Sequence, residues 1–327
     1  MKALITGGNG FLGQHLVPLL LQQDMHVRVL GRQERFALSL PVEYYKGDIR
    51  HFPDVLEATR GVEVLFHIAS KAGIESHPTL YDSTNIQGTL NVLEACRQNR
   101  VSKCIYTSSP CVVFNGKAIR NGDESLPYSP HPLCDYARTK IQAEKLILKA
   151  NSATLKTIAL RPHLLFGHRD QHLIPRILQR LRAGRLVRVG SGKNFVDMTH
   201  IRNAAHAHEL AFLALLRGHP GGKAYFIGQE RPLCLWTVID DILQRLRCPS
   251  ITRTISFGAA YTTGFFLEKF SQWRKNHQEP LMTRFLAIAL SKDHYFSQRA
   301  AEQDLGYIPK ISIEEAMRDY DPLTQIL

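Results

Sequence analysis

The sequence predicts an α/β fold in which a doubly wound parallel sheet carries helices on both faces. Three observations lead to this prediction. Short apolar runs alternate with amphipathic stretches over the first two thirds of the 327-residue chain. A glycine-rich turn follows the first of these runs directly, and a mainly helical region follows the alternating part. Alternating strand and helix signals are typical of parallel sheets, because a helix connects one parallel strand to the next.

Each predicted element is a segment with the period of a strand or of a helix. Strands are expected at Lys2–Thr6, His26–Leu30, Val42–Lys46, Val64–Ile68, Cys104–Thr107, Lys156–Arg161 and Ala224–Ile227. The helices between them include Phe11–Gln23, Leu80–Gln98 and Tyr136–Ala150. Beyond about Phe166 the pattern changes, and we expect an amphipathic basic helix at Leu173–Arg185 and a helical, apolar-rich stretch at Ser250–Ser297.

The composition is that of a soluble globular protein. Hydrophobic residues make up 44% of the chain and charged residues 21%. No window approaches the roughly 18 consecutive apolar residues of a membrane helix. Lys2 leads straight into a strand, so no signal peptide is expected. The six cysteines form no CxxC pair, which favours reduced thiols and a cytoplasmic location.

The chain is basic, with a formal net charge of +12. Eight basic residues lie between Arg169 and Arg202, against two aspartates. This stretch forms either a solvated face or a contact for an anionic ligand or a membrane surface. Nucleic acid is not expected as a partner, because the stretch holds one aromatic residue and no nucleic-acid-binding motif. No metal site is expected at His163, His168 and His172, which are more typical of loop or pocket-lining histidines.

Gly7, Gly10 and Gly13 lie three residues apart between the first strand and the first helix. Glycine permits a tight turn at the first position, close approach of the backbone to a phosphate at the second, and close packing of helix on sheet at the third. The N-terminus of the helix then offers N–H groups and the positive end of its dipole to an anion. The motif predicts a dinucleotide site in a Rossmann-type domain.

The end of the second strand distinguishes the two nicotinamide dinucleotides. An acidic residue there would accept hydrogen bonds from the ribose 2′-OH, but this chain has Gly31-Arg32. Arginine can pair with a 2′-phosphate, so we expect NADP(H) to be preferred, with NAD(H) as the alternative. Asp48 is expected either to reach an adenine amino group or to be a simple turn residue. Ala69 and Ser70 are expected to line the cofactor.

Tyr136 and Lys140 are four residues apart on a predicted helix and therefore share one of its faces. An ammonium beside a phenol is expected to lower the tyrosine pKa from its usual value of about 10. The phenol can then donate a proton to a carbonyl oxygen as a hydride arrives, or accept one in reverse. Ser108 and Ser109 follow the strand at Cys104–Thr107, where they either orient the substrate oxygen or cap the strand end.

The segments TGGNGFLG, HIAS, YTSS, YARTK and LRPHLLFG occur in this order along the chain. With this set of motifs the chain resembles the extended short-chain dehydrogenase/reductase superfamily, and within it the 3β-hydroxysteroid dehydrogenase branch. The stretches at 106–116, 160–167 and 172–178 are most similar to those of bacterial 2-alkyl-3-oxoalkanoate reductases, which act on long-chain β-keto acids. The resemblance covers essentially the whole chain.

The resemblance implies roles for individual residues. Ser109, Tyr136 and Lys140 would form the catalytic triad, and Lys140 would also bind the nicotinamide ribose. Asn85 would support the site. The residues that would meet the nicotinamide are Pro162 and His163. The full set of expected cofactor contacts is Gly7, Asn9, Gly10, Phe11, Leu12, Gly13, Arg32, Asp48, Ile49, Ala69, Ser70, Lys71, Asn85, Tyr136, Lys140, Pro162 and His163.

We assign a smaller, mainly helical substrate lobe to residues 166–194 and 229–327, and the dinucleotide-binding Rossmann domain to residues 1–165 with about 195–228. The aromatic stripe at Phe257–Trp273 either walls an apolar pocket, packs in the lobe, or makes a peripheral membrane contact. Basic side chains of the helix near Arg176 are expected either to hold a substrate carboxylate or to lie in solvent. The expected substrate contacts are Ser108, Ser109, Phe166 and Arg176.

Three functions remain in view. The first is an NAD(P)-dependent oxidoreductase that interconverts a keto and a hydroxy group on a small apolar substrate, either a long-chain 2-alkyl-3-oxo acid or a 3β-hydroxysteroid or sterol. The second is a nucleotide-sugar epimerase or dehydratase on the same scaffold, against which an NADP preference argues. The third is a non-catalytic dinucleotide sensor, against which the intact triad argues. A homodimer is considered as the assembly, and membrane association as an addition to the cytoplasmic location.

Overall fold

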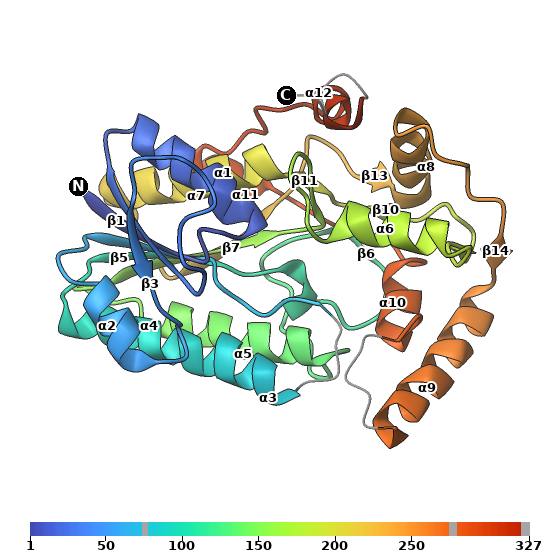
Figure 1. Ribbon diagram of the computed structural model, residues 1–327, viewed down its shortest axis with the longest axis horizontal. Helices are drawn as coiled ribbons and strands as arrows, with labels where there is room; N and C mark the ends of the chain where they lie inside the picture. The colour runs from blue at the N-terminus through green and yellow to red at the C-terminus, as the bar shows by residue number, and fades with distance from the viewer. Residues whose placement is uncertain (74–77, 275–279, 322–327) are drawn as a thin grey trace.

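The structure is a computed structural model that describes residues 1–73, 78–274 and 280–321. Its centre is a parallel sheet of seven strands, which confirms the predicted fold class (Figure 1). All seven predicted strands are present, with ends that agree to within one residue. In spatial order the strands are β12 (Lys223–Ile227), β7 (Lys156–Pro162), β5 (Lys103–Thr107), β4 (Val64–His67), β1 (Lys2–Thr6), β2 (His26–Gly31) and β3 (Glu43–Lys46).

The strand order reverses at β1. The chain builds outward from β1 to β3 and then returns to β4 on the other side of β1. At such a reversal the connections leave the sheet in opposite directions, which opens a crevice at the carboxyl ends of the two central strands. The glycine turn follows β1 and the Ala69 segment follows β4, so both lie at this edge of the sheet.

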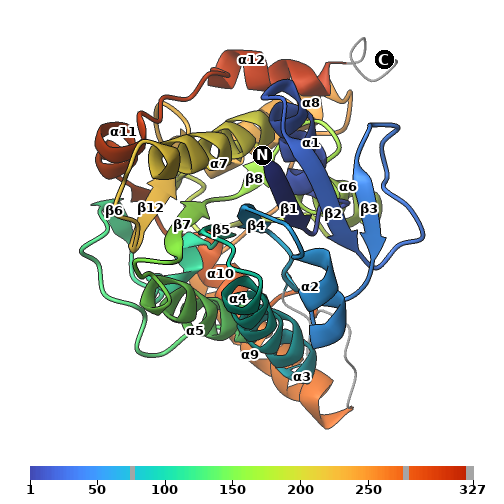
Figure 2. The same ribbon diagram turned by 90° about the vertical axis from the view of Figure 1, so that its left-hand side faces the viewer.

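Helices cover both faces of the sheet (Figure 2). Because both faces are covered, the β1 residues Ala3, Leu4 and Ile5 are completely buried, as expected for a central parallel strand. One face carries α1 (Phe11–Gln22), α7 (Ile201–Leu216) and α11 (Arg299–Leu305). The other carries α2 (Phe52–Ala58), α4 (Gly88–Gln98) and α5 (Asp135–Lys149).

The helix predicted at Leu80–Gln98 consists of three consecutive pieces. A short helix α3 (Pro78–Tyr81) leads into the π-helical segment η1 (Asp82–Gln87), and α4 follows it. The wider π-helical turn shifts the side chains that follow it around the helix axis, and such turns are frequent at functional sites. Here the π-helical segment carries the buried Asn85.

A second lobe lies beside the sheet, on the right of Figure 1. A core of its own, which includes Phe166, Trp236 and Leu243, holds it together. Its strands are β6 (Ile119–Gly122), β8 (Leu165–Phe166), β9 (Arg188–Val189), β10 (Phe195–Val196), β11 (Thr199–His200), β13 (Leu233–Cys234), β14 (Thr254–Ile255) and β15 (His294–Phe296). Its helical segments are α6 (Leu173–Arg182), α8 (Leu235–Arg245), α9 (Phe257–Trp273), α10 (Arg284–Ala289), α12 (Ile313–Met317) and η3 (Arg318–Tyr320). The short helix η2 (Pro110–Val112) follows β5 and packs on α5.

The stretch 250–297 is not wholly helical, and this corrects the expectation from its composition. It contains the strands β14 and β15 as well as α9 and α10. The strand β15 pairs with β10 and β6, and β14 pairs with β9, partners that lie far away in the sequence. Strands of two or three residues are too short to show an alternating pattern, so their pairing is decided by tertiary contacts.

Candidate active site

The glycine turn after β1 has the shape that close contact with a phosphate group requires. Gly7 has a φ of +75°, and a Cβ atom on it would lie 2.9 Å from the backbone of Ala69. A Cβ on Gly13 would lie 2.4 Å from the Cα of Gly8, so only glycine lets α1 pack this close to the turn. No side chain caps α1 at Gly10, and its first turn carries no acidic residue. These residues fit a dinucleotide pyrophosphate.

The structure gives Asn9 a supporting position. Its side-chain amide donates hydrogen bonds to Oε1 of Gln33 at 2.6 Å and to the carbonyl of Arg35 at 3.1 Å. Its Oδ1 accepts one from the N–H of Ala37 at 2.8 Å. Asn9 therefore fastens the glycine turn to the loop that follows β2. This loop begins at the exposed Arg32.

Arg32 lies across from the end of β3, close enough for its charge to act on Asp48. Burial tends to raise the pKa of Asp48, but hydrogen bonds from Arg50 and the nearby charge of Arg32 lower it on balance. The Asp48 carboxylate is already paired with the Arg50 guanidinium at 2.6 Å. Ile49 is buried and contacts α4, where its carbonyl accepts a hydrogen bond from Asn91 at 2.8 Å.

Asn85 holds the segment that follows β4. Its Oδ1 accepts a hydrogen bond from the N–H of Lys71 at 2.7 Å, and its Nδ2 donates to the carbonyl of the same residue at 3.0 Å. The amide also donates to Oγ1 of Thr139 on α5 at 3.0 Å. This buried side chain thus ties the Ala69–Lys71 segment to the helix of Tyr136, which gives physical content to the supporting role expected of Asn85.

Ser109 and Tyr136 lie close together, because the Ser109 side chain is near enough to the phenol to act on the pKa of Tyr136, which it tends to lower. Ser109 begins the short helix η2, where its Oγ accepts the N–H of Cys111 at 3.3 Å. Ser108 lies beside it with a buried hydroxyl that has no hydrogen-bond partner among the described residues. The structure therefore brings the hydroxyl groups expected at the reacting centre together at the end of β5.

Lys140 follows Tyr136 by one turn of α5, and the structure gives no hydrogen bond between these two side chains. The lysine is almost fully buried, and its Nζ donates to the carbonyl of Thr107 at 2.5 Å while lying 4.3 Å from the centre of the Tyr106 ring. Burial lowers the pKa of Lys140 to about 8. Burial, and the nearby Cys111, raise the pKa of Tyr136 well above its usual value.

The expected lowering of the tyrosine pKa is therefore wrong for this structure. The physical reason is desolvation: the protein around the phenol disfavours its charged form, and the Lys140 ammonium is engaged by a backbone carbonyl. A neutral phenol is the protonation state that can give a proton away.

A buried ion pair that was not predicted from the sequence attaches α5 to β7. Glu144 follows Lys140 by four residues and accepts hydrogen bonds from the Arg161 guanidinium of β7 at 2.6 and 3.1 Å. The Tyr128 hydroxyl donates to the same carboxylate at 2.8 Å. The spacing of four residues between Lys140 and Glu144 indicates that the two share one face of the helix. Nothing in the sequence indicates that Arg161 of β7 is the partner of Glu144.

Pro162 ends β7, and His163 follows it. Nε2 of His163 lies 2.6 Å from Nδ1 of His294, the first residue of β15. The role of His294 was not predicted from the sequence, since nothing local distinguishes a residue 131 positions further along the chain. Among the described residues, no group of three or more His, Cys, Asp or Glu side chains is placed to hold a metal ion.

Two expected substrate contacts lie in the lobe. Phe166 is completely buried in the core of the lobe, where its ring meets the edge of His200, so it supports the lobe rather than lining an open surface. Arg176 is an exposed residue of α6, and its guanidinium lies 3.9 Å from the position of a Cβ on Gly73. This places α6 over the segment that leaves β4.

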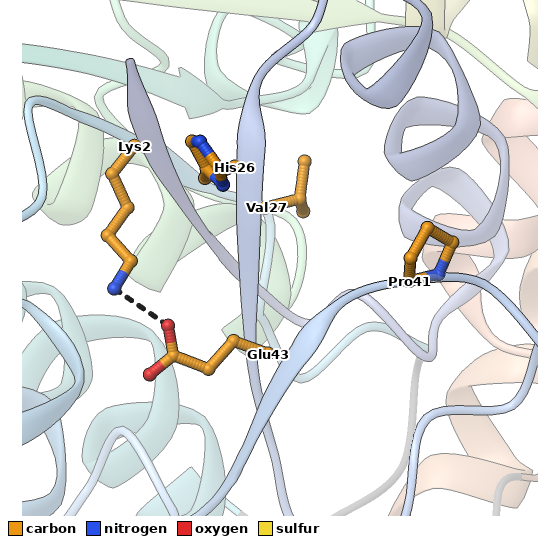
Figure 3. A pocket seen from close by; sticks show the side chains of 5 residues that line it. All are labelled: Lys2, His26, Val27, Pro41 and Glu43. Carbon is orange, nitrogen blue, oxygen red and sulfur yellow. Dashed lines mark ion pairs between the residues drawn. The ribbon is translucent and has the colours of Figure 1, made fainter.

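A separate surface pocket lies at the opposite end of the strands (Figure 3). Lys2, His26 and Glu43 line it, and each is the first residue of its strand. An ion pair of 2.7 Å joins Lys2 to Glu43 there. Because the glycine turn and the triad lie at the carboxyl ends of the strands, this pocket is no part of the candidate active site.

The relatives of this chain are named as reductases and dehydrogenases. A profile of the 3-beta hydroxysteroid dehydrogenase/isomerase family matches residues 4–255. The chain is 40% identical over 322 residues to a 2-alkyl-3-oxoalkanoate reductase of Stenotrophomonas maltophilia, which covers 97% of this chain and 98% of that protein. It is 35% identical over 322 residues to a decarboxylating sterol-4-alpha-carboxylate 3-dehydrogenase of Mus musculus, with 97% and 89% covered.

Solved structures share the fold. MoeE5 in complex with UDP-glucose and NAD has a TM-score of 0.77 to this chain, with 21% identity and 100% and 99% of the two chains covered. A UDP-glucose 4-epimerase of Brucella ovis in complex with NAD has a TM-score of 0.75, with 23% identity and 99% and 98% covered. The curated relatives are reductases and dehydrogenases, and this chain is an NAD(P)-dependent oxidoreductase. It belongs to the 3-beta hydroxysteroid dehydrogenase/isomerase family.

Proposed function

We propose that this protein reduces the keto group of a long-chain 2-alkyl-3-oxo acid, with a 3β-hydroxysteroid or sterol as the second candidate substrate. The observation that carries the proposal is the proximity of Ser109 and Tyr136 at the end of β5, with the buried Lys140 one turn further along α5. The glycine turn that fits a dinucleotide follows the central strand β1, which β4 separates from β5. The similarity to 2-alkyl-3-oxoalkanoate reductases supports the choice of substrate.

Each residue of the triad has a distinct task in the proposed reaction. When bound, the nicotinamide supplies a hydride for reduction or accepts one for oxidation. Ser109 holds the substrate oxygen beside the Tyr136 hydroxyl, and that hydroxyl gives its proton to the oxygen during reduction. Lys140, held by the Thr107 carbonyl, would bind the nicotinamide ribose, as the resemblance implies, and the phenolate regains its proton from solvent.

The test is an assay of the purified protein with NADPH and a freshly prepared 2-alkyl-3-oxo acid. We expect loss of NADPH absorbance together with a hydroxy acid product that is two mass units heavier than the substrate. A 3β-hydroxysteroid with NADP⁺ is the parallel assay for the second candidate. Absence of turnover with both substrates, in protein that binds the cofactor, would contradict the proposal.

A nucleotide-sugar epimerase on the same scaffold is the alternative. The solved structures of this fold include MoeE5 with UDP-glucuronic acid and NAD, and the basic stretch around α6 has the charge to suit a diphosphate. The alternative predicts conversion of a UDP-sugar with no net consumption of NADPH. Incubation with UDP-glucose, followed by chromatography of the sugar nucleotides, separates the two functions.

We also propose that NADP(H) is preferred over NAD(H). The support is the exposed Arg32 directly after β2, and the pairing of Asp48, a carboxylate on which the charge of Arg32 acts, with Arg50. A guanidinium bound to a phosphate discriminates by about tenfold or more. Replacing Arg32 by alanine should weaken NADPH binding by that factor and leave NADH binding unchanged, with Arg60→Ala as a remote control. Equal affinity of the wild type for both nucleotides would contradict this preference.

Peripheral membrane contact through α9 is a further part of the proposal. The helix lies at the edge of the lobe, and Phe266 and Trp273 are 64% and 77% exposed (Figure 1). The basic Lys269 is exposed on the same helix, and Arg274 follows it. Exposed aromatic and basic side chains are typical of helices that lie in a membrane interface. Among the described residues, none of the helices has the length and hydrophobicity needed to cross a bilayer.

Co-sedimentation with vesicles tests this contact. We expect binding to phosphatidylglycerol vesicles, little binding to phosphatidylcholine vesicles, and loss of binding in the double variant Phe266→Ser and Trp273→Ser. Equal sedimentation of the variant and the wild type would contradict it.

A homodimer stays a prediction, and light scattering of the purified protein measures its mass directly.

A further inference from the structure

His163 and His294 form a closely joined pair between the sheet domain and the lobe. His163 follows β7, and His294 begins β15. The distance between Nε2 of His163 and Nδ1 of His294 is 2.6 Å, and the two ring centres are 4.8 Å apart. The second nitrogen of His294, Nε2, lies 2.8 Å from the carbonyl oxygen of Ala289 at the end of α10.

When both rings are neutral, this arrangement permits only one tautomer of His163 and one of His294. A carbonyl oxygen can only accept, so Nε2 of His294 must carry the hydrogen that it donates to Ala289. Nδ1 of the neutral His294 is then bare and accepts the hydrogen bond from Nε2–H of His163. It follows that Nδ1 of the neutral His163 carries no hydrogen.

The surroundings keep both rings neutral at physiological pH. Burial, and then the mutual repulsion of the two rings, lower the pKa of His163 well below its usual value, and burial also lowers the pKa of His294. The Asp293 carboxylate tends to raise the pKa of His294, but it is engaged by Arg120 at 2.6 Å. Two uncharged rings also contact the pair: Phe114 meets His294 at 5.2 Å, and Phe296 meets His163 at 6.2 Å.

The bare Nδ1 of His163 has no hydrogen-bond partner in the part of the chain that the structure describes. It can only accept a hydrogen bond. The preceding Pro162 has no backbone N–H to offer it. We propose that His294 is a positioning residue, which fixes His163 as an acceptor for the carboxamide N–H of the bound nicotinamide. The inference rests on the proposed function, in which His163 lies beside the nicotinamide.

The tautomer itself is tested without cofactor, by ¹⁵N NMR of the histidine rings, with His163→Phe used to assign the signals. We expect a protonated Nε2 and a bare Nδ1 for His163 in the wild type, and a mixture of tautomers in His294→Phe. His294→Gln should restore the wild-type state, because its amide can donate to Ala289 and accept from His163. A bare Nε2 on His163 in the wild type would overturn the inference.

The contact with the nicotinamide is tested by calorimetry with NADP⁺ and with its 3-acetylpyridine analogue, in which a methyl group replaces the carboxamide nitrogen. One neutral hydrogen bond predicts that the wild type prefers NADP⁺ by about threefold to tenfold. We expect this preference to vanish in His163→Phe and His294→Phe and to persist in His294→Gln. Phe114→Leu, which changes a ring neighbour of His294 without touching the hydrogen bonds, should keep it.

The outcomes separate the inference from the proposed function. An undiminished preference for NADP⁺ in His294→Phe overturns the positioning role while leaving the oxidoreductase intact. Failure of the wild type to bind either nucleotide refutes the proposed function and the nicotinamide contact together, while the tautomer measurement still reports whether His294 fixes His163. Circular dichroism and thermal unfolding of each variant identify a loss of structure.

Discussion

The contacts that stabilise the cofactor side of the molecule differ in sequence separation from those that stabilise the substrate lobe. On the cofactor side, each functional residue lies next to the element that positions it: Gly7 follows β1, Ser109 follows β5 and Tyr136 lies in the first turn of α5. Where the lobe meets the sheet domain, the pair His163–His294 spans 131 residues, and within the lobe the hydrogen bond from the His168 N–H to Asp319 spans 151. The structure of the cofactor side can therefore be predicted from neighbouring residues. The structure of the lobe is determined by contacts between residues that are distant in the sequence.

The largest expected effect on stability is in the lobe, at Phe166. Its side chain is completely buried, and replacement by alanine removes packing from the core of the lobe. We expect a loss of about 3–5 kcal/mol in the free energy of unfolding, measured with urea. Phe266→Ala, at an exposed position of α9, is the matched control and should change little. If the two regions are as distinct as their contacts indicate, NADPH binding survives in Phe166→Ala at low urea after substrate turnover is lost.

A somewhat smaller loss is expected on the cofactor side, at Glu144. Replacing this carboxylate by glutamine leaves the Arg161 guanidinium buried without a counter-charge. Removal of one partner from a buried pair costs about 3 kcal/mol or more, again measured by urea unfolding. Because α5 carries Tyr136 and Lys140, NADPH affinity and turnover should fall together. Glu94→Gln, in the exposed pair with Arg97, is the control, and a similar loss there would contradict the comparison.

A pH-dependent loss is expected from His67, the last residue of β4. Its nitrogens are bonded to Thr6 and Thr89, and burial, with the charge of Lys140 beside it, lowers its pKa to about 3. The unfolded chain takes up a proton below about pH 6.5, whereas the folded one does not until near pH 3. The stabilisation is therefore complete above pH 6.5 and falls as the pH is lowered toward 3.

Between pH 7 and pH 5 this single group should lower the free energy of unfolding by about 2 kcal/mol. The measurement is urea unfolding of the wild type and of His67→Gln at both pH values. The variant should lose about that much less than the wild type over this interval. Identical pH dependence in the two proteins would show that His67 is not the group that titrates.

Local patterns predicted most of the sheet domain. The strands, the glycine turn and the spacing of Tyr136 and Lys140 all follow from patterns of neighbouring residues. The resemblance to known reductases added the expected roles of Asn85 and His163. The sign of the shift in the tyrosine pKa was wrong, because desolvation depends on the protein that surrounds the phenol. The strand β15 and its His294 were beyond prediction, because a strand of three residues is formed by its distant partners.

The proposed reaction depends most on the Tyr136 hydroxyl as the group that gives the proton. Replacing Tyr136 by phenylalanine removes that hydroxyl and keeps the ring, so the glycine turn and the lobe should be undisturbed. The measurement is turnover of the 2-alkyl-3-oxo acid beside the dissociation constant for NADPH. We predict a fall in kcat of about a hundredfold to ten-thousandfold with NADPH affinity unchanged. Near wild-type kcat in a variant that binds NADPH normally would contradict it.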